Sequence, residues 1–175
     1  MDNYLLLDVD SSLEELSKKL SFTKTHFLGR DLVLVQGNLK EILRKSQQAQ
    51  AQKKTVLCFV RSEEELHYVL EKTPVHIILG VERIHHSDSL HYLRGGLDQI
   101  LCRLAAEKRK IIGFSFSSLL NARDLGKTLA RMRFNWRLCQ KFGVKTIFSN
   151  FSVEKWEMRS TRDLAAWERI LAKKN

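Results

Sequence analysis

The residues best suited to chemistry in this 175-residue chain lie in one polar segment, residues 80–99. The segment follows an apolar run and holds three histidines, Asp88, hydroxyl groups and two arginines ahead of a double glycine. Imidazole and carboxylate groups can bind a metal ion, transfer protons or pair with phosphates and partner proteins. Because α/β proteins place function where strands end and loops begin, this segment is the first candidate for a functional site.

The metal-binding interpretation of this loop rests on four side chains, His85, His86, Asp88 and His91. Imidazole and carboxylate suit zinc or manganese, but a tight site usually draws ligands from several strand ends, and the other strand ends offer few matching residues. We therefore expect no metal site. Hydrogen bonding and charge pairing with phosphates or a protein partner is favoured for the histidines, Arg83 and Arg94, and some of these groups could instead satisfy polar atoms within the loop.

The basic charge of the chain is confined to its second part. Residues 1–75 contain 11 Lys and Arg against 11 Asp and Glu, whereas residues 76–175 contain 19 against 9, so the whole net charge of +10 lies there. Lysine and arginine that neutralise phosphates release counterions and drive salt-sensitive binding. A polyanion is therefore the predicted partner of the second part, with a merely soluble basic surface as the alternative.

Short apolar runs alternate with amphipathic stretches along the chain, a pattern typical of parallel strands covered by helices. A capping box at Ser12 and Glu15 predicts the first helix, and a Gln-rich end is expected to fray or be solvated in the second. Six strands are predicted over residues 4–7, 32–35, 56–60, 76–79, 111–114 and 144–148, with residues 25–28 a weaker seventh. Helices are predicted from Ser12 to about residue 20, over residues 39–52, after Ser62, over residues 97–105 and 124–142, and from about residue 163 to 172. In the fourth of these, the core-facing side is predicted from the spacing of Leu97, Ile100, Leu101, Leu104 and Ala105.

These elements predict one α/β domain over residues 1–175, either a small barrel or a doubly wound open sheet. No apolar run is long enough to span a membrane and the first residues do not resemble a signal peptide, so a cytoplasmic location is expected. Cys58, Cys102 and Cys139 lack the spacing of a metal site or a disulfide framework and are expected to be buried thiols. Ser115 and Ser117 lack a nucleophile-elbow motif, so a helix cap is favoured.

The longest predicted helix, residues 124–142, has two different sides. One arc of apolar side chains is expected to face the core, namely Leu125, Leu129, Met132, Trp136 and Cys139. The remaining circumference mixes cations with two large apolar residues, namely Lys127, Arg131, Arg133, Arg137, Lys141, Phe134 and Leu138. A solvated face would usually carry more acid, so this side is predicted to be an interface.

Four stretches of the second part resemble, in the same order, the ribonuclease P protein component 3 family, the thirty-kilodalton-type subunit of archaeal and eukaryotic ribonuclease P. They comprise the segment from Ile78 to Gln99, Gly113-Phe114-Ser115-Phe116-Ser117-Ser118-Leu119-Leu120-Asn121, Asn135-Trp136-Arg137-Leu138-Cys139-Gln140-Lys141-Phe142-Gly143-Val144 and Met158-Arg159-Ser160-Thr161-Arg162-Asp163-Leu164. The resemblance implies a compact TIM-barrel-like fold, complete or incomplete, with mostly parallel strands. That fold is related to the metal-dependent phosphoesterases of polymerase and histidinol phosphatase type.

The resemblance implies a function in ribonuclease P, which removes the 5′ leader of precursor tRNA. In that family the RNA is catalytic and uses magnesium ions, so this chain is expected to be a subunit of an endoribonuclease without a catalytic residue, metal or bound cofactor of its own. The implied partners are the ribonuclease P RNA, protein component 2, the other protein subunits and precursor tRNA. The expected contact residues are Arg83, His86, His91, Arg94, Arg131, Arg133, Arg137, Lys141, Arg159 and Arg162.

Two other functions compete with this expectation. A stand-alone metal-dependent phosphoesterase would use Asp8, Asp10, His85, His86 and Asp88. The related phosphoesterases carry a His-x-His pair after the first strand, where this chain has Asp8-Val9-Asp10, which disfavours that function. A general protein that binds structured RNA would share the basic surface, and only the resemblance separates it from the ribonuclease P subunit.

Overall fold

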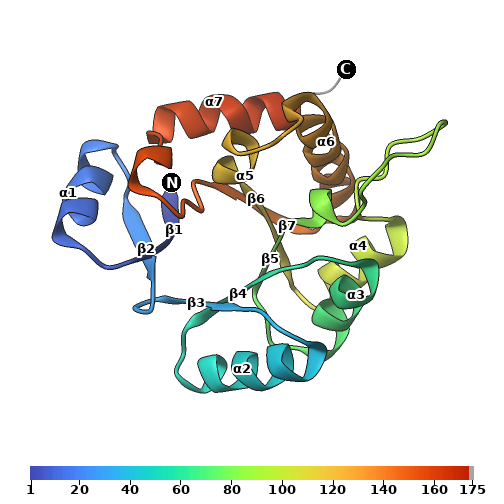
Figure 1. Cartoon of the computed structure of the whole chain (residues 1–175), viewed down its shortest axis with the longest axis horizontal. Coiled ribbons are helices and arrows are strands. Elements are labelled where there is room, and N and C mark those ends of the chain that lie inside the picture. The colour runs from blue at the N-terminus through green and yellow to red at the C-terminus, as the bar shows by residue number, and fades with distance from the viewer. Residues whose placement is uncertain (174–175) are drawn as a thin grey trace.

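A computed structural model describes residues 1–173 of the chain as a single curled sheet surrounded by helices (Figure 1). The seven strands are β1 (Asp2–Asp8), β2 (Lys24–Leu28), β3 (Leu32–Val35), β4 (Thr55–Phe59), β5 (Ile77–Leu79), β6 (Ile111–Ser115) and β7 (Lys145–Ser149). Each strand pairs in parallel with the next in sequence, giving the order β1 to β7. The predicted α/β, TIM-barrel-like fold with parallel strands is therefore confirmed, and the weaker seventh strand is present as β2.

The sheet curls until its two edges meet. The N–H of Leu6 in β1 donates to the carbonyl of Ser152, just beyond β7, at 2.9 Å, and the N–H of Tyr4 donates to Ser149 Oγ at 3.0 Å. Leu5 and Ser152 form an isolated parallel β-bridge, so the two edges of the sheet are joined without a full eighth strand. The carboxyl ends of all the parallel strands consequently lie on one rim.

The seven helices lie around the outside of the curled sheet (Figure 1). They are α1 (Ser11–Lys19), α2 (Leu39–Ala51), α3 (Glu63–Lys72), α4 (Gln99–Glu107), α5 (Phe116–Leu120), α6 (Leu125–Phe142) and α7 (Thr161–Ala172), with short 3₁₀ turns η1 (Val81–Arg83) and η2 (Lys155–Glu157). β2 and β3 have no helix between them; they share only the pair Leu28 with Leu32, at a turn where Gly29 has a φ of +76°. No helix in the described part of the chain is long and apolar enough to cross a membrane.

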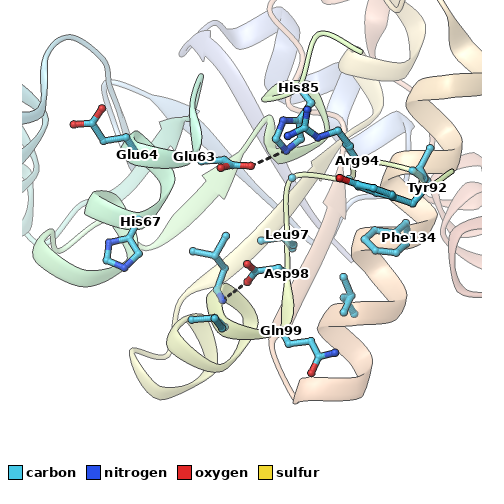
Figure 2. A pocket seen from close by; sticks show the side chains of 16 residues that line it. Glu63, Glu64, His67, His85, Tyr92, Arg94, Leu97, Asp98, Gln99 and Phe134 are labelled. Carbon is cyan, nitrogen blue, oxygen red and sulfur yellow. Dashed lines mark hydrogen bonds and ion pairs between the residues drawn. The ribbon is translucent and has the colours of Figure 1, made fainter. Parts of the chain in front are cut away.

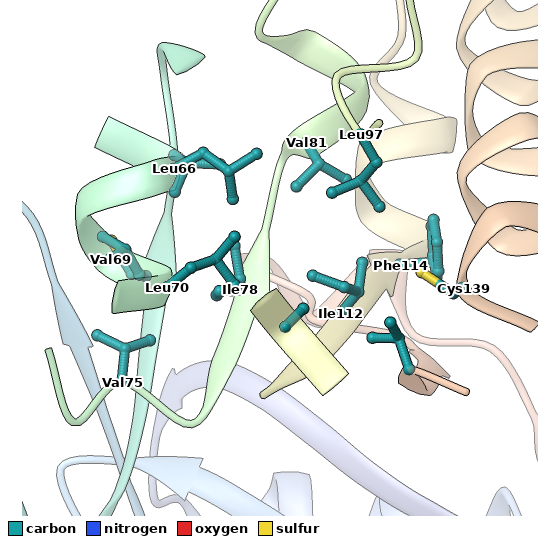
Figure 3. Packing of buried hydrophobic residues seen from close by; sticks show 14 of the residues in the cluster. Leu66, Val69, Leu70, Val75, Ile78, Val81, Leu97, Ile112, Phe114 and Cys139 are labelled. Carbon is teal, nitrogen blue, oxygen red and sulfur yellow. The ribbon is translucent and has the colours of Figure 1, made fainter. Parts of the chain in front are cut away.

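Apolar side chains fill both sides of the sheet. The inner cluster comprises Leu6, Leu32, Leu57, Ile77, Leu79 and Phe151, so the interior is a packed core, as in larger barrels. The outer cluster joins the sheet to the helices, and Figure 3 shows Leu66 and Leu70 of α3 facing Ile78 of β5. All three cysteines are free and buried, as predicted, and burial raises the pKa of the Cys58 thiol to about 12.

Several helix ends follow their sequence signals and one prediction is wrong. Gly143 ends α6 in the left-handed conformation, and Ser115 caps α5 by accepting from the N–H of Ser118. The first helix is capped by Asp10 instead of Ser12, because the Asp10 carboxylate accepts the N–H of Ser12. α2 extends to Ala51, and the glutamines at its end are solvated, as one of the two expected alternatives had it. Ser46 and Ala49 on the other side of the same helix are buried against the core.

The predicted faces of α4 and α6 require three corrections. Met132, Trp136 and Cys139 are buried as expected, but Leu125 is 47% exposed, because it occupies the first position of α6, where residues 124–126 are all exposed. Ile100 of α4 is 70% exposed, since the core-facing arc of this helix is narrower than its spacing suggests. Arg131, assigned to the outward side, is only 4% exposed.

Gly113 tests the packing inside the curled sheet. A Cβ at this position of β6 would lie 2.5 Å from Leu79 Cδ2 and 2.9 Å from Ile77 Cγ2. Overpacking of this kind costs about 1–3 kcal/mol, so Gly113→Ala is expected to lower Tm by about 2–12 °C, measured by circular dichroism. Gly126→Ala in α6 is the control, because its Cβ would meet Asp124 Oδ1 at an ordinary 3.6 Å. A Gly113→Ala protein as stable as wild type would contradict this packing.

Candidate interaction site on the loop between β5 and α4

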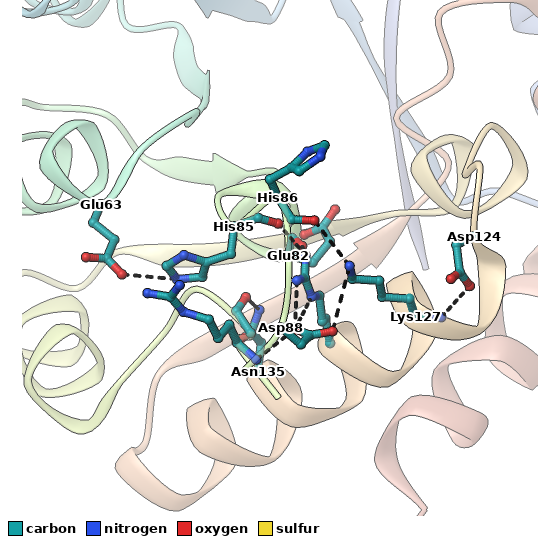
Figure 4. A network of polar contacts seen from close by, with 11 residues as sticks. Glu63, Glu82, His85, His86, Asp88, Asp124, Lys127 and Asn135 are labelled. Atoms are coloured by element: carbon teal, nitrogen blue, oxygen red, sulfur yellow. Dashed lines mark hydrogen bonds and ion pairs between the residues drawn. The ribbon is translucent and has the colours of Figure 1, made fainter. Parts of the chain in front are cut away.

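The loop of residues 84–98, which we call the β5–α4 loop, is attached to α6 through the buried side chain of Arg131. Figure 4 shows Asp88 of the loop close to Lys127 of α6 in the same network. Arg131 Nε and Nη2 donate to Asp88 Oδ1 at 2.9 and 2.7 Å. Arg131 Nη1 donates to the carbonyl oxygens of Glu82 at 3.1 Å and His85 at 2.6 Å. One side chain thus holds both the start of the loop and its carboxylate. All three guanidinium nitrogens are engaged within the protein, so Arg131 lies inside the fold and not on the predicted contact surface.

Two further residues of α6 continue this attachment. Lys127 Nζ donates to the carbonyl of His86 at 3.2 Å and lies 3.9 Å from Asp88 Oδ2. Asn135, which is fully buried, donates from Nδ2 to the Gly95 carbonyl at 2.6 Å and accepts the N–H of Leu97 at 3.4 Å. Residues 127, 131 and 135 are spaced by four, so they form one row along the side of α6 that contacts the loop.

The double glycine brings the end of the loop against α6 and η1. A Cβ on Gly95 would lie 2.5 Å from both Asn135 Oδ1 and a Phe134 ring carbon. A Cβ on Gly96, whose φ is +99°, would lie 2.0 Å from the Val81 carbonyl oxygen. Neither position has room for a side chain. The helix itself begins later, at Gln99, where Asp98 is the N-cap.

Asp88 is ionised because of its contacts. Partial burial acts to raise the pKa of this carboxyl, but the N–H of Arg94 and the cations of Arg131 and Lys127 outweigh burial, and the pKa is lowered. Its Oδ1 also accepts the N–H of Arg94 at 2.9 Å, which closes the loop on itself. Asp88 is therefore a structural counter-ion of the loop, engaged by two cations.

Glu82, at the carboxyl end of β5, is the most isolated acid in this region. It is 2% exposed, and its Oε2 has no hydrogen-bond partner among the described residues. Burial raises the pKa of this carboxyl, and the charges of Arg83 and Arg131 only partly oppose that effect. The nearby guanidinium of Arg131 contacts the Glu82 backbone carbonyl and not its carboxylate.

The middle of the β5–α4 loop projects from the protein (Figure 1). It carries exposed apolar and basic side chains. Leu90 is 98% exposed and Tyr92 is 64% exposed. His86, His91 and Arg94, all predicted contact residues, are exposed on the same loop. A firmly attached loop with an uncovered apolar tip is typical of a surface that binds another macromolecule.

A cleft of about 870 Å³ lies beside this loop, between α3, α4 and α6 (Figure 2). Figure 2 shows Tyr92 of the loop close to Phe134 of α6, and the exposed Ile100 lines the same cleft. Across it, His85 Nε2 lies 3.0 Å from Glu63 Oε1. Burial and the charge of Arg94 lower the pKa of His85, so its imidazole is mainly neutral and its contact with Glu63 is not a full ion pair. The lining is thus apolar toward α6 and acidic toward α3.

The remaining predicted contact residues lie on other surfaces. Arg133 and Arg137 of α6 donate to the carbonyl of Lys173 at the end of α7, at 3.3 and 3.1 Å. Lys141 lies over the ring of Phe142. Arg83 is exposed and donates to the Ser118 carbonyl at 3.1 Å, Arg159 packs near η2, and Arg162 is exposed at the start of α7. The structure thus gathers His86, His91 and Arg94 on one loop but distributes the other cations.

The acids proposed for a metal-dependent phosphoesterase are not gathered into one site. Asp10 caps α1, Asp88 pairs with Arg131 and Lys127, and His85 contacts Glu63. Residues 1–173 contain no group of three His, Cys, Asp or Glu side chains placed to hold a metal ion. The chemistry that the loop can perform is recognition of another molecule through hydrogen bonds, charge and apolar contact.

Sequence reasoning missed the cleft beside the loop. Glu63 was assigned no function, although its position one residue after the Ser62 cap predicts an exposed carboxylate at the start of α3. Tyr92 and Ile100 were also missed, the first because it lies in an irregular loop and the second because its spacing predicts a core position. Leu90 and Tyr92, two large apolar residues within the otherwise polar run of residues 85–92, were the available signal.

Comparison with known proteins finds curated relatives that are ribonuclease P component 3 proteins. The chain is 38% identical to ribonuclease P protein component 3 of Thermococcus kodakarensis over 71 residues, which cover 39% of this chain and 32% of that protein. It is 32% identical to the component 3 protein of Methanocaldococcus jannaschii over 114 residues, which cover 64% of this chain and 44% of that protein. This chain resembles ribonuclease P protein component 3. The resemblance expected from the sequence is confirmed, although the matches span less than half the length of these curated relatives, and no family model matches the chain.

A solved structure shares the fold over nearly the whole chain. It is a chain in the cryo-EM structure of archaeal ribonuclease P with mature tRNA, with a TM-score of 0.67 and 20% sequence identity, covering 98% of this chain and 73% of that one. At this identity the likeness concerns the fold. The curled parallel sheet with outer helices is therefore an architecture that also occurs in an archaeal ribonuclease P structure.

The contact between Asp88 and Arg131 is expected to stabilise the whole domain. Asp88→Ala would leave the buried guanidinium without its carboxylate, and breaking such a pair costs about 3 kcal/mol, which corresponds to a Tm lower by about 6–12 °C. Lys127→Ala is the matched control, since its pair with Asp88 is longer and more exposed and should change stability by less than about 1 kcal/mol. Equal Tm values for the two variants in thermal unfolding would contradict the role assigned to Arg131.

The buried Glu82 carboxyl predicts a pH-dependent stability. Its pKa is higher in the folded state than the value of about 4.3 in an unfolded chain, so it lowers the free energy of unfolding as pH rises above that value. Glu82→Gln removes the ionisable group. The Tm of Glu82→Gln minus the Tm of wild type is therefore expected to be higher at pH 8 than at pH 4.5. A Tm difference that is constant or reversed between these pH values would show that Glu82 is not held neutral by burial.

Proposed function

We propose that this chain is a protein subunit of ribonuclease P and supports RNA-catalysed, magnesium-dependent removal of the 5′ leader from precursor tRNA. The observation that carries the proposal is the construction of the β5–α4 loop. The Asp88 carboxylate of the loop and the buried Arg131 of α6 are engaged with each other, while the exposed residues of the loop are suited to contact with another molecule. Similarity to component 3 proteins supports the same function. The chain holds no catalytic residue in this account, and the RNA supplies the reacting groups and magnesium ions.

The two kinds of exposed surface suggest two kinds of partner. The cleft beside the loop, with Tyr92, Ile100 and Phe134, has the apolar centre and polar margin of a protein interface, and we assign it to protein component 2. The exposed cations Arg94, Lys141 and Arg162 suit phosphate groups of the ribonuclease P RNA and precursor tRNA. Arg131 is not included, because its nitrogens are used within the protein.

The competing function as a stand-alone phosphoesterase is less well supported. Three of the five residues that it requires are used in separate contacts, namely the Asp10 cap of α1, the ion pair of Asp88 with Arg131 and the contact of His85 with Glu63. A hydrolytic metal centre needs several ligands converging on one point. Metal-dependent hydrolysis of a phosphodiester by the purified chain alone, lost in Asp8→Ala, would favour that function.

Reconstitution of precursor tRNA cleavage tests the proposed function. The cognate ribonuclease P RNA and component 2 are assayed at limiting magnesium, with this chain added or left out. We expect correct 5′ cleavage to increase only when the chain is present with component 2, and we expect a chain with Arg94, Lys141 and Arg162 replaced by glutamine to need lower salt for the same effect. Unchanged cleavage on adding the folded wild-type chain would refute the proposed function.

A further inference from the structure

The rim formed by the carboxyl ends of the strands carries an exposed aromatic ring that the proposed function does not use. Trp156 lies in η2, between β7 and α7, and is 62% exposed. Val153, three residues earlier, is 50% exposed. The other two tryptophans pack against the core, Trp136 at 5% exposure and Trp167 against the ring of Phe116. A large aromatic ring left in solvent at the functional end of a barrel-like fold is a candidate contact for a ligand.

The backbone that presents Trp156 is held firmly by its neighbour Glu157, which is 1% exposed. The Glu157 carboxylate accepts the N–H groups of Val153 at 2.8 Å and Glu154 at 3.2 Å. It also accepts hydrogen bonds from Ser117 Oγ of α5 at 2.9 Å and from Nδ2 of Asn121, the C-cap of α5, at 2.5 Å. Burial acts to raise the pKa of this carboxyl, but these donors outweigh burial and lower the pKa, so it is ionised. Trp156 is thus displayed from a fixed turn, at little cost in ordering on binding.

Cations surround this turn. Arg159 Nη1 donates to the carbonyl of Trp156 at 2.9 Å, and its guanidinium lies over the ring of Phe116 at 5.5 Å. Lys155 Nζ donates to Ser12 Oγ at 3.1 Å. The nearby acids have other partners, since Glu154 caps η2 and Asp10 caps α1.

Two more arginines lie on the same rim. Arg61 and Arg83 follow β4 and β5 and line a cleft of about 460 Å³ together with Phe59, Val60 and Gly80. Arg83 donates to the carbonyl of Ser118 in α5, the helix whose Ser117 contacts Glu157. α5 therefore connects the arginine side of the rim to the tryptophan side through fixed hydrogen bonds.

We propose that this rim binds an unpaired RNA strand, with a base stacked on Trp156 and phosphates held by Arg83 and Arg61. Stacking on an exposed ring suits any base, and arginines beside it suit the backbone of the same strand. The excess of positive charge in residues 76–175 favours a nucleic acid over an acidic or apolar protein segment. The proposal rests on the proposed function, since it specifies where the chain contacts RNA.

Tryptophan fluorescence of the full chain tests the proposal directly. Single-stranded oligoadenylate of 12 nucleotides is titrated into the wild type, and we expect quenching that saturates. Trp156→Phe should keep the affinity within a few-fold but lose most of the quenching, and Trp156→Ala should bind about tenfold more weakly or worse by fluorescence anisotropy of a labelled strand. Arg83→Ala should make the slope of log affinity against log salt concentration shallower by about the contribution of one phosphate contact. Ile170→Ala, an exposed apolar residue of α7, is the matched control and should bind as wild type does.

The outcomes separate this proposal from the proposed function. Equal binding of oligoadenylate by wild type and a folded Trp156→Ala chain would overturn the proposal, whether or not the chain stimulates precursor tRNA cleavage. Loss of component 2 binding in Trp156→Ala with unchanged strand binding would assign the rim to a protein partner and would also overturn it. A chain that binds the strand through Trp156 but does not stimulate precursor tRNA cleavage would refute the subunit function. The RNA-binding rim would still stand in that case.

Discussion

The buried guanidinium of Arg131 is the interaction on which the functional part of this molecule depends. A charged group at 4% exposure is tolerated only when its donors are satisfied, and here one carboxylate and two backbone carbonyls accept them. The same contacts fix the β5–α4 loop on α6. The polar segment that is most conspicuous in the sequence is therefore first a structural element, and its exposed tip is available for recognition because its base is held.

The curled sheet supplies the frame for this arrangement. Seven parallel strands bring their carboxyl ends to one rim, and the junction between Leu6 and Ser152 brings the first and last parts of the chain together. The β5–α4 loop, the cleft lined by Arg61 and Arg83, and the turn of Trp156 all follow strand ends. A compact fold with a packed interior thus offers several contact surfaces at the strand ends and beside the β5–α4 loop.

Local signals in the sequence predicted most of the fold but less of the site. Six strands, the extent of α6 and the stop at Gly143 followed from apolar spacing and glycine, because those patterns report directly on local geometry. The position of Arg131 did not follow, since helical spacing places it on the polar side and only the tertiary contact with Asp88 explains its burial. The cleft was also missed, because Glu63, Ile100 and Phe134 come from three separate helices. A site assembled from distant segments leaves little trace in local periodicity.

Hydrogen exchange of the β5–α4 loop, followed by mass spectrometry, tests most directly whether this loop is a fixed platform. The N–H of Arg94 is accepted by Asp88 and that of Leu97 by Asn135, so both should be protected in the wild type. In Asp88→Asn, we expect much faster exchange across residues 84–98 because the ion pair with Arg131 is lost, while the strands of the core stay protected. A wild-type loop that exchanges as fast as an unfolded chain, or a loop unaffected by Asp88→Asn, would contradict the central role of the contact between Asp88 and Arg131.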